Sequence, residues 1–81
     1  MFLKQTGLSR AAALQLIALA HRAFRWGEKA TGSKWAERLE AEATTAFNEA
    51  AHRLGFDVVW PGLWPLLRRD GHDFHLPESL P

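Results

Sequence analysis

The sequence of 81 residues contains no cysteine. Without thiols the chain forms no disulfide, Cys-ligated zinc site or iron–sulfur cluster, and it has no cysteine nucleophile. A folded chain of this length buries only about 63% of its unfolded surface, which allows one small core. A domain without such staples depends on packing, including packing against another copy of itself. We therefore expect a single domain, residues 1–81, that forms a homodimer or a larger homo-oligomer.

Acidic residues are missing from the N-terminal third, where none precedes Glu28. A nearly continuous apolar run, Ala11–Ala20, follows Lys4 and Arg10 there, which is also typical of a secretory signal peptide. Ten residues are too few to span a bilayer. Because apolar positions continue at helical spacing to Trp26, we expect this run to remain in the fold. The predicted location is the cytoplasm, with no membrane contact.

The net charge is only +1, but the charge is unevenly distributed. Residues 1–40 carry seven Lys or Arg and three Glu, whereas residues 41–81 carry three Arg and six Asp or Glu. Domains that bind nucleic acid over a large surface are usually strongly basic. A chain with opposite charge in its two halves favours head-to-tail or antiparallel self-association instead.

Two amphipathic helices are predicted, over residues 9–29 and 33–54. Ser9 and Ser33 are suitable N-caps, and Gly55 is suitable as the residue that follows the second helix. The apolar arc of the first helix is wider than one partner helix can cover, so it should contact two layers or two subunits. The second helix presents many alanines, which permit close approach. The two helices should form an antiparallel hairpin.

Contact between copies is expected on the apolar faces of these helices. Glu40 lies at the edge of the second apolar face, where its carboxylate either extends to the rim or pairs with an arginine across a contact. The positions predicted for an oligomer interface are Leu16, Leu19, Glu40, Ala43 and Phe47.

Residues 56–76 change to an extended pattern. Phe56–Trp60 is rich in β-branched and aromatic residues, and Asp70-Gly71 predicts a type I′ turn of a β-hairpin. The hairpin register places Leu67 opposite Phe74 and Arg68 opposite Asp73. The predicted fold is therefore α+β, an antiparallel two-helix hairpin followed by a small antiparallel β-hairpin or meander. The tail from Pro77 to Pro81 is expected to fray.

No motif indicates an enzyme, a metal site or a cofactor. His72 and His75 lie three residues apart on a strand, so they point to opposite faces and cannot chelate one ion. His21 and His52 fall on helices. The His72-Asp73 pair is a feature of some phosphohydrolases, but the further ligands of that chemistry are missing. We expect no catalytic residue, no metal and no cofactor.

A basic stripe on the first helix is formed by Arg22, Arg25 and Lys29. With help from Arg10 and His21 it could contact phosphates. An ordinary solvated helix face gives the same pattern, so both interpretations stand.

The segment from Trp60 to Pro65 concentrates two Trp and two Pro. These rings either close the core or form an exposed aromatic anchor. Strand alternation from the hairpin register points Trp64 away from the helices, and Trp with Arg is the usual composition of binding hot spots. The predicted partner-binding patch consists of Trp60, Leu63, Trp64, Arg68, Arg69 and His75.

The stretch Leu54–Pro65, followed by Asp70-Gly71 and Phe74, resembles the C-terminal part of small orphan proteins encoded by bacteriophages and prophages. The resemblance covers about the last third of the chain and transfers no functional residue. It implies a non-enzymatic accessory factor that binds and inhibits or redirects a host protein. The expected function is a small cytoplasmic interaction protein; the alternative is a nucleotide- or nucleic-acid-binding module that uses the basic stripe.

Overall fold

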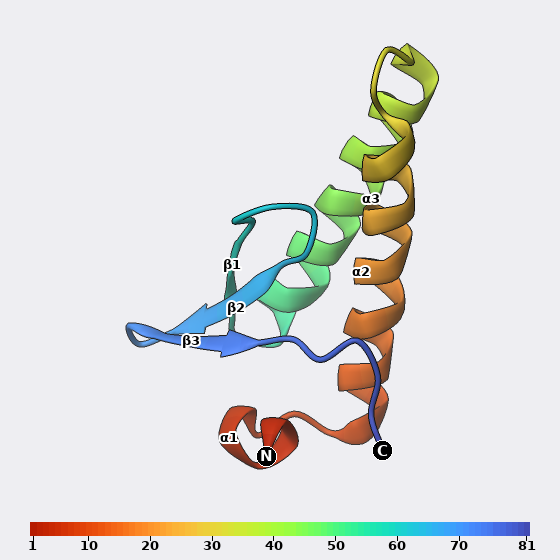
Figure 1. The fold of residues 1–81 in the computed structure, drawn as a ribbon. Helices are drawn as coiled ribbons and strands as arrows, with labels where there is room; N and C mark the ends of the chain where they lie inside the picture. The colour runs from red at the N-terminus through yellow and green to blue at the C-terminus, as the bar shows by residue number, and fades with distance from the viewer.

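The computed structural model describes residues 1–81 and has an α+β architecture, as predicted. A two-helix hairpin carries a small three-stranded sheet on one side, and a short extra helix precedes the hairpin (Figure 1). Along the helix pair, the sheet lies beside the part nearer the chain termini, and the turn between the helices stands clear of it. The elements are α1 (Phe2–Thr6), α2 (Arg10–Lys29), α3 (Lys34–Arg53), β1 (Asp57–Val59), β2 (Leu66–Arg69) and β3 (His72–His75).

Both predicted N-caps are confirmed. The Ser9 hydroxyl accepts a hydrogen bond from the Ala12 amide at 3.1 Å, and the Ser33 hydroxyl accepts one from the Ala36 amide at 3.2 Å. Each bond satisfies a backbone donor that the first helical turn leaves unpaired. Two serines therefore fix where α2 and α3 begin. Neither helix is long and apolar enough to cross a membrane.

The end of α3 is closed by the predicted glycine. Gly55 has a φ of 91°, and its amide donates to the carbonyl of His52 while the Phe56 amide donates to that of Ala51, both at 3.0 Å. This pair of bonds is a Schellman motif, which needs a left-handed residue after the helix. The motif turns the chain back so that Phe56, 2% exposed, packs against the helix it has just left.

The sheet is an antiparallel meander in the order β1-β2-β3. Leu67 pairs with Phe74 and Arg68 pairs with Asp73, as predicted. The turn residues Asp70 and Gly71 both have positive φ, 52° and 78°, which confirms the type I′ turn.

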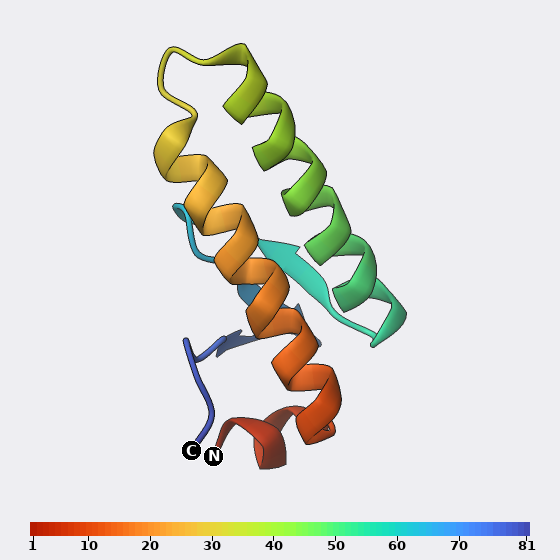
Figure 2. The ribbon, with the colours of Figure 1, turned by 90° about the vertical axis from the view of Figure 1, so that its right-hand side faces the viewer.

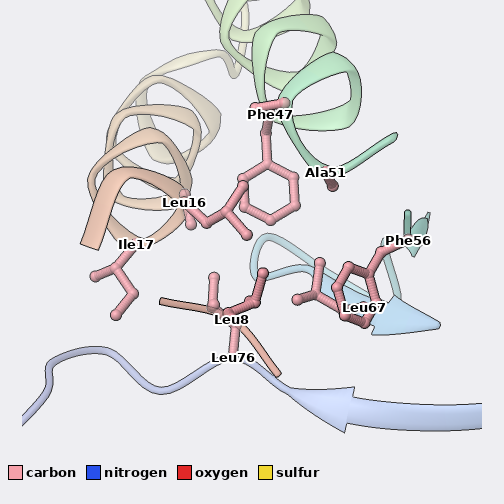
Figure 3. Close-up of a cluster of buried hydrophobic side chains, with 10 residues drawn as sticks. Leu8, Leu16, Ile17, Phe47, Ala51, Phe56, Leu67 and Leu76 are labelled. Carbon is pink, nitrogen blue, oxygen red and sulfur yellow. The ribbon is translucent and has the colours of Figure 1, made fainter. Parts of the chain in front are cut away.

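The core lies where the sheet meets the helix pair. In Figure 3, Leu16 of α2 and Phe47 of α3 point toward each other, with Phe56 and Leu67 on the sheet side and Leu76 below. All belong to one buried cluster. Leu16 and Phe47 are fully buried within a single copy, and Ala43 is 4% exposed between the helices. The prediction that these three residues lie at an oligomer interface is wrong, because the chain's own elements already cover them.

The first eight residues form an element that the sequence analysis missed. The short helix α1 ends at Gly7, whose φ is 74°. The buried Thr6 hydroxyl donates to the Phe2 carbonyl at 2.8 Å and accepts from the Leu8 amide at 3.3 Å. Leu8 then joins the core cluster. The helix α1 therefore covers the end of the core that is farthest from the turn between α2 and α3.

The C-terminal tail is docked rather than frayed. The Arg10 guanidinium donates to the Pro81 carbonyl at 2.8 Å, and His21 Nε2 donates to the Glu78 carbonyl at the same distance. Leu80 is half-buried against the core cluster. These contacts explain why the tail runs beside the start of α2 instead of extending into solvent.

Candidate interaction surface

The predicted aromatic anchor packs against the core. Trp64 is half-buried, its indole N–H donates to the Leu76 carbonyl at 2.8 Å, and its ring packs edge-on against His21 and Phe24, with centroids 4.9 and 6.3 Å away. The prediction that Trp64 points outward is wrong. Pro65 separates it from β2, so the alternation of side chains along a strand does not extend to it.

Trp60 also packs inward. Its indole N–H donates to Asn48 Oδ1 at 2.9 Å, and its ring meets that of Phe47 edge-on at 5.5 Å. Both indoles therefore satisfy their polar atom while covering apolar surface, which is how Trp is accommodated in a core. The Trp60–Trp64 segment, which we call the aromatic plug, covers the helix pair. Of the two interpretations, the one in which these rings close the core is correct.

The remaining members of the predicted patch do not form one surface. Arg69 is half-buried, with its guanidinium 4.4 Å from the Phe56 ring centre and 3.1 Å from the Thr6 carbonyl, to which it donates. It therefore fastens α1 to the sheet. His75 is exposed on β3. Leu63 lies near α2, where a methyl group on Gly27 would come within 2.8 Å of it.

Arg68 is engaged by the predicted cross-strand ion pair. Its Nε donates to Asp73 Oδ1 at 2.6 Å and its Nη2 donates to Oδ2 at 3.1 Å. These hydrogen bonds hold the pKa of Asp73 below its ordinary value and raise the pKa of Arg68. A guanidinium already bound in this fork geometry is less available to a partner.

The basic stripe is exposed as a group. Arg22, Arg25 and Lys29 lie on the solvent side of α2, and none forms an ion pair within the chain. The ammonium of Lys29 sits 5.4 Å from the Trp26 ring centre. Arg10 and His21, which were expected to assist the stripe, are instead engaged by the C-terminal tail.

Three hollows mark the surface. The largest, about 470 Å³, lies between α1 and the tail and is mainly apolar. The second, about 450 Å³, lies beside Trp64 and Phe24. The third, about 370 Å³, lies on α3 and is lined by Ala41, Glu42, Thr45, Ala46 and Glu49. No group of three or more His, Asp or Glu side chains is arranged to hold a metal ion.

The side of the helix pair that faces away from the sheet is uncovered. Figure 2 shows α2 and α3 side by side in front, with the sheet behind them. Phe24 of α2 and Asn48 of α3 contact the Trp60–Trp64 segment, so they mark the covered side. A residue two positions away on a helix lies about 160° around it. Trp26 and Ala46 therefore lie on the uncovered side.

Apolar residues follow this uncovered side on both helices at helical spacing. We call this surface the open face, and we define it by Ala12, Leu19 and Trp26 of α2 and by Trp35, Leu39 and Ala46 of α3. Trp35 is 71% exposed, and the other five are half-buried, Ala12 and Leu19 because they also pack against the core cluster. The apolar pattern of both helices was visible in the sequence, but the sequence did not show that the sheet covers just one side of the pair.

The two edges of the open face carry opposite charge. Arg22 and Lys29 border it on α2, four residues before and three residues after Trp26. Glu42 and Glu49 border it on α3, three residues after Leu39 and Ala46 respectively. Residues three or four apart are neighbours on a helix, so each charged side chain adjoins the apolar strip. Glu49 is also paired with Arg53 at 3.6 Å on the same helix.

Comparison of the chain with protein-family models, with curated proteins and with solved structures found no match. The open face brings together the exposed ring of Trp35 and half-buried apolar side chains of both long helices. Charge of both signs borders it. Surfaces of this composition, an aromatic and aliphatic centre with a charged rim, are typical of protein–protein interfaces.

Proposed function

We propose that this chain is a protein-interaction module that binds through its open face rather than a catalyst. The observation that supports this is the position of Trp35, which is 71% exposed in line with Leu39 on α3. An exposed Trp offers a large, rigid area for contact, and Trp is the residue type most enriched in binding hot spots. Exposed apolar patches with a polar rim mark interaction sites in small proteins.

We propose that α2 and α3 bind the partner, and that the Trp60–Trp64 segment does not. The segment buries its indoles against the chain's own core, whereas α3 leaves Trp35 uncovered. Indole rings that are already packed against the core offer a partner little further apolar area. We therefore assign partner binding to the helix side of the molecule.

The proposed setting is the cytoplasm. The resemblance of the C-terminal third to phage-encoded accessory proteins supports a module that acts by occupying a protein surface, with a host protein as one class of target. In that setting the sheet stabilises the helix pair, and the helix pair makes the contact.

The test is a comparison of three tagged baits, each mixed with untagged protein and a bacterial lysate. The baits are the natural chain, a Trp35→Ser/Leu39→Ser variant and a Leu14→Ser control. Leu14 is 44% exposed on α2, on the side opposite the open face. We expect every specifically retained protein, including a further copy of this chain, to be lost with the double variant and kept with the control. Retention that is equal for all three baits would refute the proposal.

A second candidate function is phosphate binding by Arg22, Arg25 and Lys29. The supporting observation is that all three cations are exposed and free of ion pairs within the chain. Changing all three to Ala should abolish salt-sensitive retention on a DNA or RNA resin if this function is present, because phosphate contacts weaken steeply with added salt. Retention that is absent in the natural chain, or unchanged in the variant, would eliminate this candidate.

A further inference from the structure

We propose that the partner of the open face is a second copy of this chain. The two copies are related by a two-fold axis parallel to α2 and α3, so that α2 of each copy lies on α3 of the other. This inference rests on the proposed function, because it names the occupant of the same surface. The resulting contact is a four-helix arrangement with a sheet on each outer side.

Charges of both signs lie beside the open face. Arg22 and Lys29 border it on α2, and Glu42 and Glu49 border it on α3. A two-fold axis brings identical patches together, so a self-complementary patch must carry both signs on opposite sides of the axis. The open face meets this condition. No carboxylate lies within ion-pair distance of Arg22 or Lys29 in one copy, and no cation lies there for Glu42.

The same charges select the direction of the axis. An axis running across the helices would place α2 on α2 and α3 on α3, which brings cations against cations and carboxylates against carboxylates. An axis parallel to the helices places each basic edge on an acidic edge. Juxtaposed like charges disfavour an interface, and opposite charges fix its register. The parallel axis is therefore the arrangement that the charge pattern supports.

The heights of the charged residues agree with this axis. The Glu40 side chain of α3 reaches α2 at the height of Gly27, because a methyl group on Gly27 would lie 2.6 Å from a Glu40 carboxylate oxygen. The helices are antiparallel and rise by about 1.5 Å per residue. Arg22, five residues before Gly27, thus lies within about one helical turn of the height of Thr45, five residues after Glu40. An axis parallel to the helices leaves heights unchanged, so Arg22 of the second copy lies within about a turn of Thr45 too.

A hollow is present at that height. It measures about 370 Å³, and Glu42 and Glu49 line it together with Thr45. Arg22 lies toward the outer edge of the open face on α2, so in the second copy it extends over the outer side of α3, where this hollow lies. A guanidinium placed there would have a carboxylate one helical turn to either side. The hollow fits the side chain that the symmetry brings to it.

The apolar centre of the contact follows from the same placement. Trp26 is adjacent to Gly27, and Leu39 is adjacent to Glu40, so the heights of these two side chains differ by no more than about one helical turn. The parallel axis brings Trp26 of each copy onto Leu39 of the other. The contact would cover half-buried side chains of both helices and the exposed ring of Trp35. The second copy would thereby cover the part of the wide apolar arc of α2 that the chain's own elements leave uncovered.

The experiment uses charge reversal and mixing, followed by sedimentation velocity. We expect the natural chain to dimerise, and Arg22→Glu and Glu42→Arg each to weaken the dimer on the order of tenfold, since each change acts twice in a symmetric contact. An equimolar mixture of the two variants should recover a dimer near the natural affinity. Arg25→Glu, on α2 but away from the open face, is the matched control and should leave the dimer unchanged.

A second pair, Arg22→Asp with Glu49→Arg, repeats the mixing independently. Circular dichroism confirms that each variant is folded. A monomeric natural chain, unaffected dimers in the single variants, or a mixture no tighter than its components would overturn the proposal. The natural chain could be monomeric while the Trp35→Ser/Leu39→Ser bait no longer retains a lysate protein that the natural bait retains. The second copy is then the wrong partner, and the interaction function stands. If that double variant retains the same proteins as the natural bait, the proposed function fails as well.

Discussion

The helix pair has two regions that differ in what covers them. Near the chain termini, the sheet covers one side of α2 and α3, and large side chains such as Phe47 and Leu16 are fully buried. Toward the turn between the helices, the buried positions are alanines such as Ala23 and Ala36, and Trp35 is left 71% exposed. Figure 1 shows this region standing clear of the sheet.

This difference gives the two regions different roles, one in stability and the other in binding. Large buried side chains supply most of the hydrophobic stabilisation of a small domain, so the covered region holds the fold together. Two helices in contact through alanine bury little area, but alanine lets them approach closely. The covered region can therefore keep the uncovered region in place while the aromatic side chains there remain available for binding.

The largest effect is expected at the centre of the covered region. Phe47→Ala should lower the free energy of unfolding by about 3–5 kcal/mol, because it removes a fully buried ring and leaves a cavity. Trp35→Ala, on the same helix, should change it by less than about 0.5 kcal/mol in the monomer. Urea unfolding at low protein concentration measures both values. A Trp35 variant as unstable as the Phe47 variant would remove the distinction between the two regions.

A smaller loss is expected at the aromatic plug. Trp64→Ala should lower stability by about 2 kcal/mol, because it removes a half-buried ring and leaves the Leu76 carbonyl without its donor. Leu63→Ala is the neighbouring control and should cost less, since Leu63 is 40% exposed. Thermal unfolding of both variants checks the order. A Trp64 variant with the melting temperature of the natural chain would contradict the placement of this ring against the core.

The connection from α3 to the sheet depends on one backbone conformation. Gly55→Ala should cost about 1 kcal/mol, because a side chain disfavours a left-handed φ. Gly62→Ala is a matched control, since Gly62 has no positive φ and open space around it. Urea midpoints of the two variants give the comparison. An equal response at both glycines would contradict the role of the Schellman motif.

The smallest effect concerns pH at the edge of the sheet. Hydrogen bonds from Arg68 hold the pKa of Asp73 below its ordinary value. A depressed pKa in the folded state stabilises the fold above the unfolded pKa of about 4, and this contribution disappears as the pH falls through the lower, folded value. Stability of the natural chain minus that of Asp73→Asn should therefore decrease below about pH 4. A difference that is constant between pH 6 and pH 2 would contradict it.

The local elements were predictable from particular residues. Ser9, Ser33 and Gly55 marked the helix ends, and Asp70-Gly71 fixed the strand register, because each satisfies backbone groups within a few residues. Long-range docking was not predictable in this way. The helix α1 depends on Arg69, 63 positions away in the sequence. The tail likewise depends on Arg10 and His21.

The candidate site was predictable only in part. The exposure of Arg22, Arg25 and Lys29 followed from helical periodicity. The position of Trp64 did not, because Pro65 interrupts the strand whose alternation was used to orient it. The open face was missed since apolar periodicity marks all the buried and half-buried sides of a helix alike, and the side that the sheet covers is decided by the tertiary fold.

The most direct test of this account is sedimentation equilibrium of the natural chain beside the Trp35→Ser/Leu39→Ser variant. The account predicts a mass of twice 9.1 kDa for the natural chain at micromolar concentration. It predicts a folded monomer for the variant, because the covered region is untouched. A natural chain that remains monomeric, or a variant that still dimerises, would contradict the claim that the open face binds a second copy.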